Sequence, residues 1–142
     1  QFNIENKNIL DLYAGSGSLG IESLSRGANF VTFVENSNNC INILKQNLSH
    51  FEINYKITKS NVDKFLDTSL NTYDIVFYDP PFKIETEIVK NEIIKIYNLL
   101  NKEGFVVVHR HTASKEFETL KNYKIHKEKN FGQSNILILS KL

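Results

Sequence analysis

Apolar, strand-like segments alternate with amphipathic, helix-like segments through most of this chain. The strand-like segments are rich in β-branched and aromatic residues and lie at 8–14, 29–35, 54–60, 73–82 and 105–111. Segments with a helical spacing of apolar residues separate them, at 19–27, 36–51, 62–70 and 86–104, the last of which Gly104 is expected to close. Because a strand–helix–strand unit lays its two strands parallel, this alternation predicts an α/β fold with helices on both faces of a parallel sheet.

The last part of the chain departs from the alternation. A short helix is expected at 113–120, and two strands follow at 123–131 and 134–142, joined through Gly132. With no helix between them, these two strands are expected to pair antiparallel. The predicted fold is Rossmann-like, with a mostly parallel seven-stranded sheet and an antiparallel C-terminal strand. Such an ending is unusual for a dehydrogenase, so it argues against a nicotinamide cofactor.

Composition sets the broad class of the protein. A length of 142 residues predicts a single domain over 1–142, and a net charge of +1 gives little indication of nucleic acid as a partner. The single cysteine fits a reducing compartment, and the lack of a long apolar run predicts no membrane span, so we expect a cytoplasmic protein without membrane contact. We also expect a monomer. Because the chain begins at Gln1 and contains no methionine, we expect a segment to be missing before it.

A glycine-rich loop follows the first strand. Residues 15–20 read Gly-Ser-Gly-Ser-Leu-Gly, a complete G-x-G-x-x-G. Glycines at these positions let the backbone approach a ligand and present N–H groups at the start of a helix. The pattern predicts a cofactor that carries adenosine, but the glycines alone do not separate a dinucleotide from another adenosine-bearing molecule.

Two further polar positions follow strands at the same predicted edge of the sheet. Glu35 ends the second strand, 20 residues after Gly15, a spacing typical of an acid that accepts hydrogen bonds from ribose hydroxyls. Asn61 and Val62 follow the third strand and could meet an adenine ring, or Asn61 could simply cap the next helix. The cofactor-binding candidates are Asp11, Tyr13, Ala14, Gly15, Ser16, Gly17, Glu35, Asn36, Asn61 and Val62.

The fourth strand ends in Asp79-Pro80-Pro81-Phe82. The two prolines stiffen the turn and are expected to leave their carbonyls without competing local donors. The Asp79 carboxylate and the Pro80 carbonyl then form a pair of acceptors beside the flat Phe82 ring. This arrangement suits a planar group that bears an NH2, such as a nucleobase. These four residues are therefore the catalytic candidates, and the alternative is a rigid strand-exit turn with a solvated acid.

These motifs are similar to those of one enzyme family. The sequence VFYDPPF resembles the [D/N/S]-P-P-[Y/F/W] signature of methyltransferases that modify exocyclic amines of bases. The loop DLYAGSGSLGIESLSRGA and the ending FGQSNILILSK resemble the RsmD-like 16S rRNA guanine-N(2)-methyltransferases. The resemblance implies a class I fold, S-adenosylmethionine as cofactor with S-adenosylhomocysteine as product, and 16S rRNA or a small-subunit assembly particle as partner.

The chain departs from that family at two places, and other functions stay open. QFNIENK stands where the family carries a basic segment, and HRH at 109–111 stands where a glutamate is common. We expect His109 and His111 to face solvent or RNA, and we predict no metal site because no cysteine or carboxylate partner completes one. The alternatives are an adenine-N(6)-methyltransferase on DNA or RNA and a non-catalytic module that binds cofactor and nucleic acid.

Overall fold

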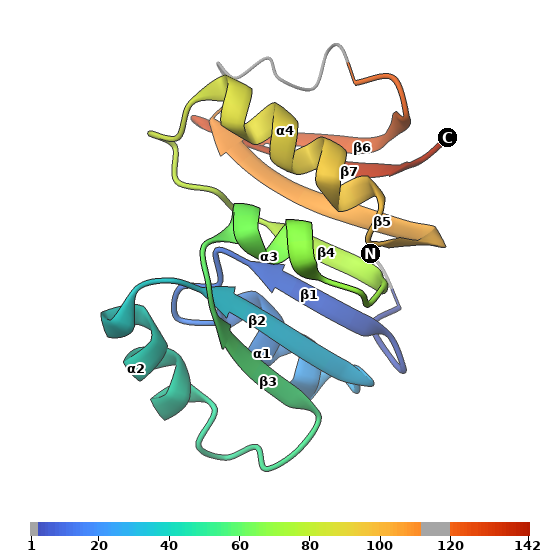
Figure 1. The fold of residues 1–142 in the computed structure, drawn as a ribbon. Helices are drawn as coiled ribbons and strands as arrows, with labels where there is room; N and C mark the ends of the chain where they lie inside the picture. The colour runs from blue at the N-terminus through green and yellow to red at the C-terminus, as the bar shows by residue number, and fades with distance from the viewer. Residues whose placement is uncertain (1–2, 112–119) are drawn as a thin grey trace.

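Seven strands form one sheet in the order β3-β2-β1-β4-β5-β7-β6 (Figure 1). The computed structural model describes residues 3–111 and 120–142. The strands are β1 (Asn8–Leu12), β2 (Phe30–Glu35), β3 (Tyr55–Lys59), β4 (Tyr73–Tyr78), β5 (Leu100–His111), β6 (Tyr123–Phe131) and β7 (Ser134–Lys141). The helices are α1 (Ser18–Ser25), α2 (Asn38–Asn47), α3 (Val62–Thr68) and α4 (Thr86–Tyr97).

The directions of the strands confirm the predicted fold class. β1 pairs parallel with β2 and β4, β2 with β3, and β4 with β5. β7 runs antiparallel to both of its neighbours, β5 and β6. The chain moves outward from β1 to β3 and then returns to the other side of β1 with β4. The carboxyl ends of β1 and β4 therefore meet at the point where the strand order reverses, which is where open α/β sheets bind ligands.

Helices cover both faces of the sheet, as the alternation predicts. Successive residues of a strand point to opposite faces, so each strand contributes to two apolar layers. Leu10 and Leu12 of β1 pack in the layer that includes residues of α3 and α4, and Ile9 packs in the layer that includes residues of α1 and α2. Figure 1 shows α3 and α4 together on one side of the sheet and α1 on the other.

The fifth strand is longer than predicted and the helix before it is shorter. The predicted helix at 86–104 ends at Tyr97, and β5 begins at Leu100. Leu100 is 2% exposed and pairs with Tyr73 at the start of β4. Gly104 therefore lies inside a strand instead of closing a helix, and a Cβ there would stand 3.0 Å from the Asp74 carbonyl oxygen. Pairing with a neighbouring strand overrides the local helical periodicity here.

Other differences lie at the ends of elements. The strands predicted at 8–14 and 73–82 end at Leu12 and Tyr78, because the residues that follow form the loops of the candidate site. Gly132 turns the β6–β7 hairpin with a φ of +56°, as predicted. The helix predicted at 113–120 lies almost entirely outside the described residues. Among the described helices, none has the length and apolarity needed to cross a membrane.

Replacing Gly20 with alanine is expected to lower the free energy of unfolding by about 1–3 kcal/mol, the cost of overpacking a core. A Cβ on this α1 residue would lie 2.3 Å from the Phe33 ring of β2, and alanine's better helix propensity of about 1 kcal/mol only partly offsets that clash. Urea unfolding measures the change, with exposed Ser25→Ala in the same helix as the control. A Gly20→Ala protein as stable as the parent would contradict this close α1–β2 packing.

Candidate cofactor and base site

The glycine loop connects β1 to α1 through backbone conformations that favour glycine. Gly15 has a φ of +59° with open space where a Cβ would stand, and Gly17 has a φ of +84°. A Cβ on Gly17 would meet the Leu44 side chain of α2. Gly17 is therefore required both by its backbone conformation and by close packing, whereas Gly15 leaves the loop surface open to a ligand.

Glu35 holds the loop at the end of the neighbouring strand. Its Oε1 accepts a hydrogen bond from the Gly15 N–H at 2.8 Å. Its Oε2 accepts bonds from the Asn36 and Ser37 N–H groups, both at 2.9 Å. A carboxylate offers about four acceptor positions, so three backbone donors leave room for one further donor. The predicted ribose acceptor is thus also a structural link between the glycine loop and the β2–α2 turn.

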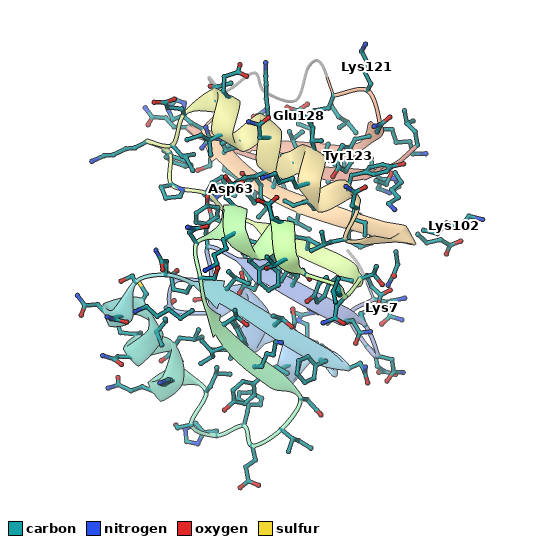
Figure 2. All side chains as sticks on the ribbon, viewed as in Figure 1. Lys7, Asp63, Lys102, Lys121, Tyr123 and Glu128 are labelled. Atoms are coloured by element: carbon teal, nitrogen blue, oxygen red, sulfur yellow. The ribbon has the colours of Figure 1, made fainter. Side chains whose placement is uncertain are left out.

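A pocket of about 450 Å³ opens beside this carboxylate, within the size range of small-molecule sites. Five of the predicted cofactor-binding residues line it: Tyr13, Glu35, Asn36, Asn61 and Val62. The remaining lining residues are Val34, Ser37, Ser60, Asp63, Ile88 and Glu92. Figure 2 shows Asp63 at this edge of the sheet, and Lys7 and Lys102 at the opposite edge. The pocket therefore lies where β2, β3 and the loop after β1 converge.

Asn61 has the helix-capping role that the sequence left open. Its Oδ1 accepts a hydrogen bond of 2.7 Å from the Lys64 N–H and caps α3. One of the two acceptor positions of that oxygen is therefore taken by the cap. The Asn61 amide NH2 and the Val62 backbone remain at the pocket wall as candidate contacts for a ring.

A buried glutamate that the motif analysis missed also borders the pocket. Glu92 of α4 is 2% exposed, and its carboxylate accepts hydrogen bonds from the Tyr13 hydroxyl at 2.8 Å and the Tyr78 hydroxyl at 2.7 Å. Burial raises the pKa of Glu92 and of both tyrosines, and Glu92 raises the tyrosine values further. The sequence signal was a single acid on the apolar face of α4, beside Val89, Ile93 and Ile96.

The Asp79–Phe82 turn is held by the end of β5. His109 Nδ1 lies 3.0 Å from Asp79 Oδ1, and Arg110 Nη1 donates to the Pro81 carbonyl at 3.1 Å. Ile84 N–H also donates to the Pro81 carbonyl at 3.1 Å. The expectation that both proline carbonyls lack local donors is therefore wrong for Pro81, because the turn folds back on itself there.

The two histidines contact Phe82. Its ring centroid lies 5.4 Å from that of His109 and 5.9 Å from that of His111, both in edge-to-face arrangements. Phe82 is still 48% exposed. The end of β5 therefore lies directly against the turn after β4, and the His109 side chain is still 35% exposed.

Pairing of β1 with β4 brings the glycine loop and the Asp79 turn together. Leu12 pairs with Tyr78, so the next residues of each strand leave the sheet side by side. The Tyr13 and Tyr78 rings stand 5.9 Å apart. One pocket for a cofactor and one turn with an exposed acid and an exposed ring therefore share this edge.

Asp11 lies beneath the loop and not at the pocket wall. It is 3% exposed, and its Oδ2 accepts a hydrogen bond of 3.1 Å from the Gly20 N–H. Burial raises the pKa of Asp11 to about 8, and the charges of Asp79 and Glu35 raise it too, against the lowering effect of the Gly20 bond. Asp11 thus positions α1 under the loop through its bond to Gly20.

The strand order, the glycine loop after β1 and the pocket beside Glu35 define the class I, S-adenosylmethionine-dependent methyltransferases. A family model described as Conserved hypothetical protein 95 matches residues 1–140. Ribosomal RNA small subunit methyltransferase D of Buchnera aphidicola (subspecies Acyrthosiphon pisum) is 34% identical over 134 residues, which cover 92% of this chain and 69% of that protein. The chain belongs to this family, that of the RsmD-like methyltransferases.

Solved structures agree with the fold. A Haemophilus influenzae protein assigned as a methylase matches with a TM-score of 0.85 at 30% identity, covering 98% of this chain and 89% of that chain. A methyltransferase structure complexed with SAH matches with a TM-score of 0.85 at 14% identity, covering 98% of this chain and 46% of that chain. At that identity the second likeness shows the fold alone.

The stability of the protein is expected to fall as the pH rises between about pH 4 and pH 8, because of Asp11. Its folded-state pKa lies above the unfolded value of 3.8, so the folded state binds the proton more tightly. The resulting stabilisation is complete below the unfolded pKa and is lost through about pH 8, with a slope of at most about 1.4 kcal/mol per pH unit.

Urea unfolding across this pH range tests the Asp11 prediction. Asp11→Asn has a neutral side chain at every pH, so the variant should show a flatter dependence of stability on pH than the parent. Asp67→Asn is the matched control, because its side chain is 57% exposed. Equal slopes in the parent and in Asp11→Asn would contradict the assignment.

Proposed function

We propose that this protein transfers a methyl group from S-adenosylmethionine to the exocyclic amine of a guanine in small-subunit rRNA. The observation that carries the proposal is the Asp79–Phe82 turn at the strand edge that also holds the cofactor pocket. The RNA substrate is supported by relatives named ribosomal RNA small subunit methyltransferase D. The guanine amine is supported by the motif resemblance and by the acceptor chemistry of the turn.

The cofactor fits the pocket by its chemistry. Glu35 retains an acceptor position for a ribose hydroxyl, and the open surface above Gly15 accommodates close approach of a ligand to the backbone. The Asn61 amide and the Val62 backbone face the same pocket and suit the adenine ring. Bound there, S-adenosylmethionine would supply an electrophilic methyl carbon attached to a sulfonium leaving group.

The turn after β4 would hold the base. The Asp79 carboxylate and the Pro80 carbonyl are acceptors for the two N–H bonds of an amine, and the half-exposed Phe82 ring offers a stacking surface. A base inside a helix cannot reach such a site, so the target must leave its stack. Hydrogen bonding to Asp79 would localise the amine lone pair, which is otherwise delocalised into the ring, and would aim it at the cofactor.

Transfer would then be a direct displacement. The nitrogen lone pair forms the new N–C bond as the C–S bond breaks. The two electrons of the broken C–S bond stay on sulfur. The nitrogen afterwards loses one proton to an acceptor or to water. The residues of this chain contribute alignment and electrostatic stabilisation, which are the main rate factors for such a step. Asp79 faces the positive charge that develops on the amine.

An adenine N6 amine offers the same two N–H bonds and is the alternative target. A module that binds without catalysis would not need an acid at residue 79. Incubation of the protein with labelled S-adenosylmethionine and either unmodified small-subunit RNA or assembly particles, followed by nucleoside analysis, distinguishes these functions. Methylguanosine supports the proposal, methyladenosine supports the alternative on RNA, and no transfer to either substrate contradicts both assignments as small-subunit RNA methyltransferases.

Glu35→Ala is expected to weaken binding of S-adenosylmethionine by roughly 1.5–3 kcal/mol, the range for hydrogen bonds to a charged group. Part of that loss comes from releasing the Gly15 N–H, since Glu35 also fixes the loop. Calorimetric titration measures the affinity. Glu35→Gln keeps one acceptor oxygen and should lose less, and exposed Glu22→Ala on α1 should bind normally. Unchanged affinity in Glu35→Ala would remove this carboxylate from the cofactor site.

Asp79→Ala is expected to slow methyl transfer by at least roughly tenfold to a hundredfold while leaving cofactor affinity nearly unchanged. Losing one charge-assisted hydrogen bond costs about 1.5–3 kcal/mol, and each 1.36 kcal/mol of barrier is tenfold in rate. Single-turnover transfer and cofactor titration measure the two effects separately. Asp79→Asn, which keeps one acceptor, should be intermediate. Transfer at the parental rate by Asp79→Ala would make the turn purely structural and the proposed function wrong.

A further inference from the structure

We infer that His109 is a positioning residue for methyl transfer: its imidazole holds one oxygen of the Asp79 carboxylate so that the other oxygen is presented to the target amine. This inference rests on the proposed function. The contact that carries it is the 3.0 Å distance between His109 Nδ1 and Asp79 Oδ1. Among the described residues, Asp79 Oδ2 has no hydrogen-bond partner, and it is therefore the oxygen available to a substrate.

The direction of this hydrogen bond follows from the chemistry of the two groups. An ionised carboxylate only accepts, so Nδ1 must carry the hydrogen and donate it to Oδ1. A carboxyl group can otherwise rotate about its terminal torsion, which is broad. A fixed donor on one oxygen removes that freedom and leaves the second oxygen in one orientation. Transfer depends steeply on alignment, so this restriction acts on the rate.

The sheet places His109 at this position rigidly. Tyr78 pairs with Val108 in the parallel β4–β5 ladder, so Asp79, the first residue after β4, lies beside His109, which is still within β5. On its other side, His109 pairs with Ile136 of β7. The His109 backbone is thus held in the β5–β7 ladder, whereas Asp79 begins a turn. His109, whose backbone is held in the sheet, therefore orients the less constrained Asp79 side chain.

His109 also contacts the second candidate group of the turn. Its ring lies edge to face against Phe82 with centroids 5.4 Å apart, at an interplanar angle of 68°. His111 makes a similar contact with the same ring at 5.9 Å and 82°. The described hydrogen bonds to Asp79 come from His109 alone. His111 is therefore a matched control that shares the Phe82 contact and not the Asp79 bond.

The His109–Asp79 pair contributes little to the stability of the fold. The side chains are 35% and 45% exposed, and exposed ion pairs contribute little because solvent screens them. Loss of the pair should therefore leave folding and the cofactor pocket intact, because neither residue lines that pocket. A change in the rate of transfer without a change in unfolding or cofactor affinity would then report on the position of Asp79.

The test compares single-turnover methyl transfer to unmodified small-subunit RNA, or to particles if only these are methylated. The variants are His109→Ala, His109→Asn, His111→Ala, Asp79→Ala and the Asp79→Ala/His109→Ala double variant. His109→Ala should be about tenfold slower, in line with loss of a hydrogen bond to a charged group. His109→Asn keeps an N–H near the Nδ1 position and should recover most of that rate. Cofactor affinity and thermal unfolding should match the parent in all five.

The double variant separates positioning from an independent role. If His109 acts through Asp79, the double variant should be no slower than Asp79→Ala. A further loss in the double variant, equal losses in His109→Ala and His111→Ala, or no recovery in His109→Asn would each overturn the inference. Methyl transfer at the parental rate by His109→Ala, together with slow transfer by Asp79→Ala, would also overturn the inference. If Asp79→Ala itself transfers at the parental rate, the proposed function fails instead.

Discussion

The parallel pairing of β1 with β4 is the constraint on which the candidate site depends. Leu12 and Tyr78 are paired at the ends of these strands, and the chain leaves both at the same edge. One exit becomes the glycine loop and the other becomes the Asp79–Phe82 turn. Because the strand order reverses at β1, the connections that follow β1 and β4 lead away from each other to opposite faces of the sheet. A cleft remains between them. Cofactor and base chemistry are therefore adjacent through the topology of the sheet.

Buried carboxyl groups fix the loops at that edge. Asp11 binds the Gly20 N–H at the start of α1, and Glu92 of α4 receives the hydroxyls of Tyr13 and Tyr78. A buried carboxyl is costly unless it is hydrogen-bonded, so each of these groups constrains its partners strongly. Glu92 connects a residue of the glycine loop to the last residue of β4. Glu92, which belongs to α4, thus holds the glycine loop and the end of β4 together.

The candidate site was partly predictable because some of its chemistry is local. The glycine spacing, the acid at the end of the second strand and the Asp-Pro-Pro-Phe turn are short motifs whose backbone requirements are contained in a few residues. Asn61 was ambiguous for the same reason, since capping and ligand binding use the same residue type, and its side-chain oxygen caps α3. The contacts of Glu92, of His109 and of Arg110 with the Pro81 carbonyl were missed because their partners come from other strands and helices.

The sequence by itself determined the alternation of strands and helices, the antiparallel ending, and the positions of the glycine loop and the Asp79 turn. These features follow from hydrophobic periodicity and from the backbone preferences of glycine and proline, which act over short distances along the chain. Only the tertiary structure decided where β5 begins, since Leu100 joins the sheet by pairing with Tyr73. It also decided that His109 meets Asp79 and that Glu92 joins Tyr13 to Tyr78. Those contacts depend on strand register and helix packing, which no local segment specifies.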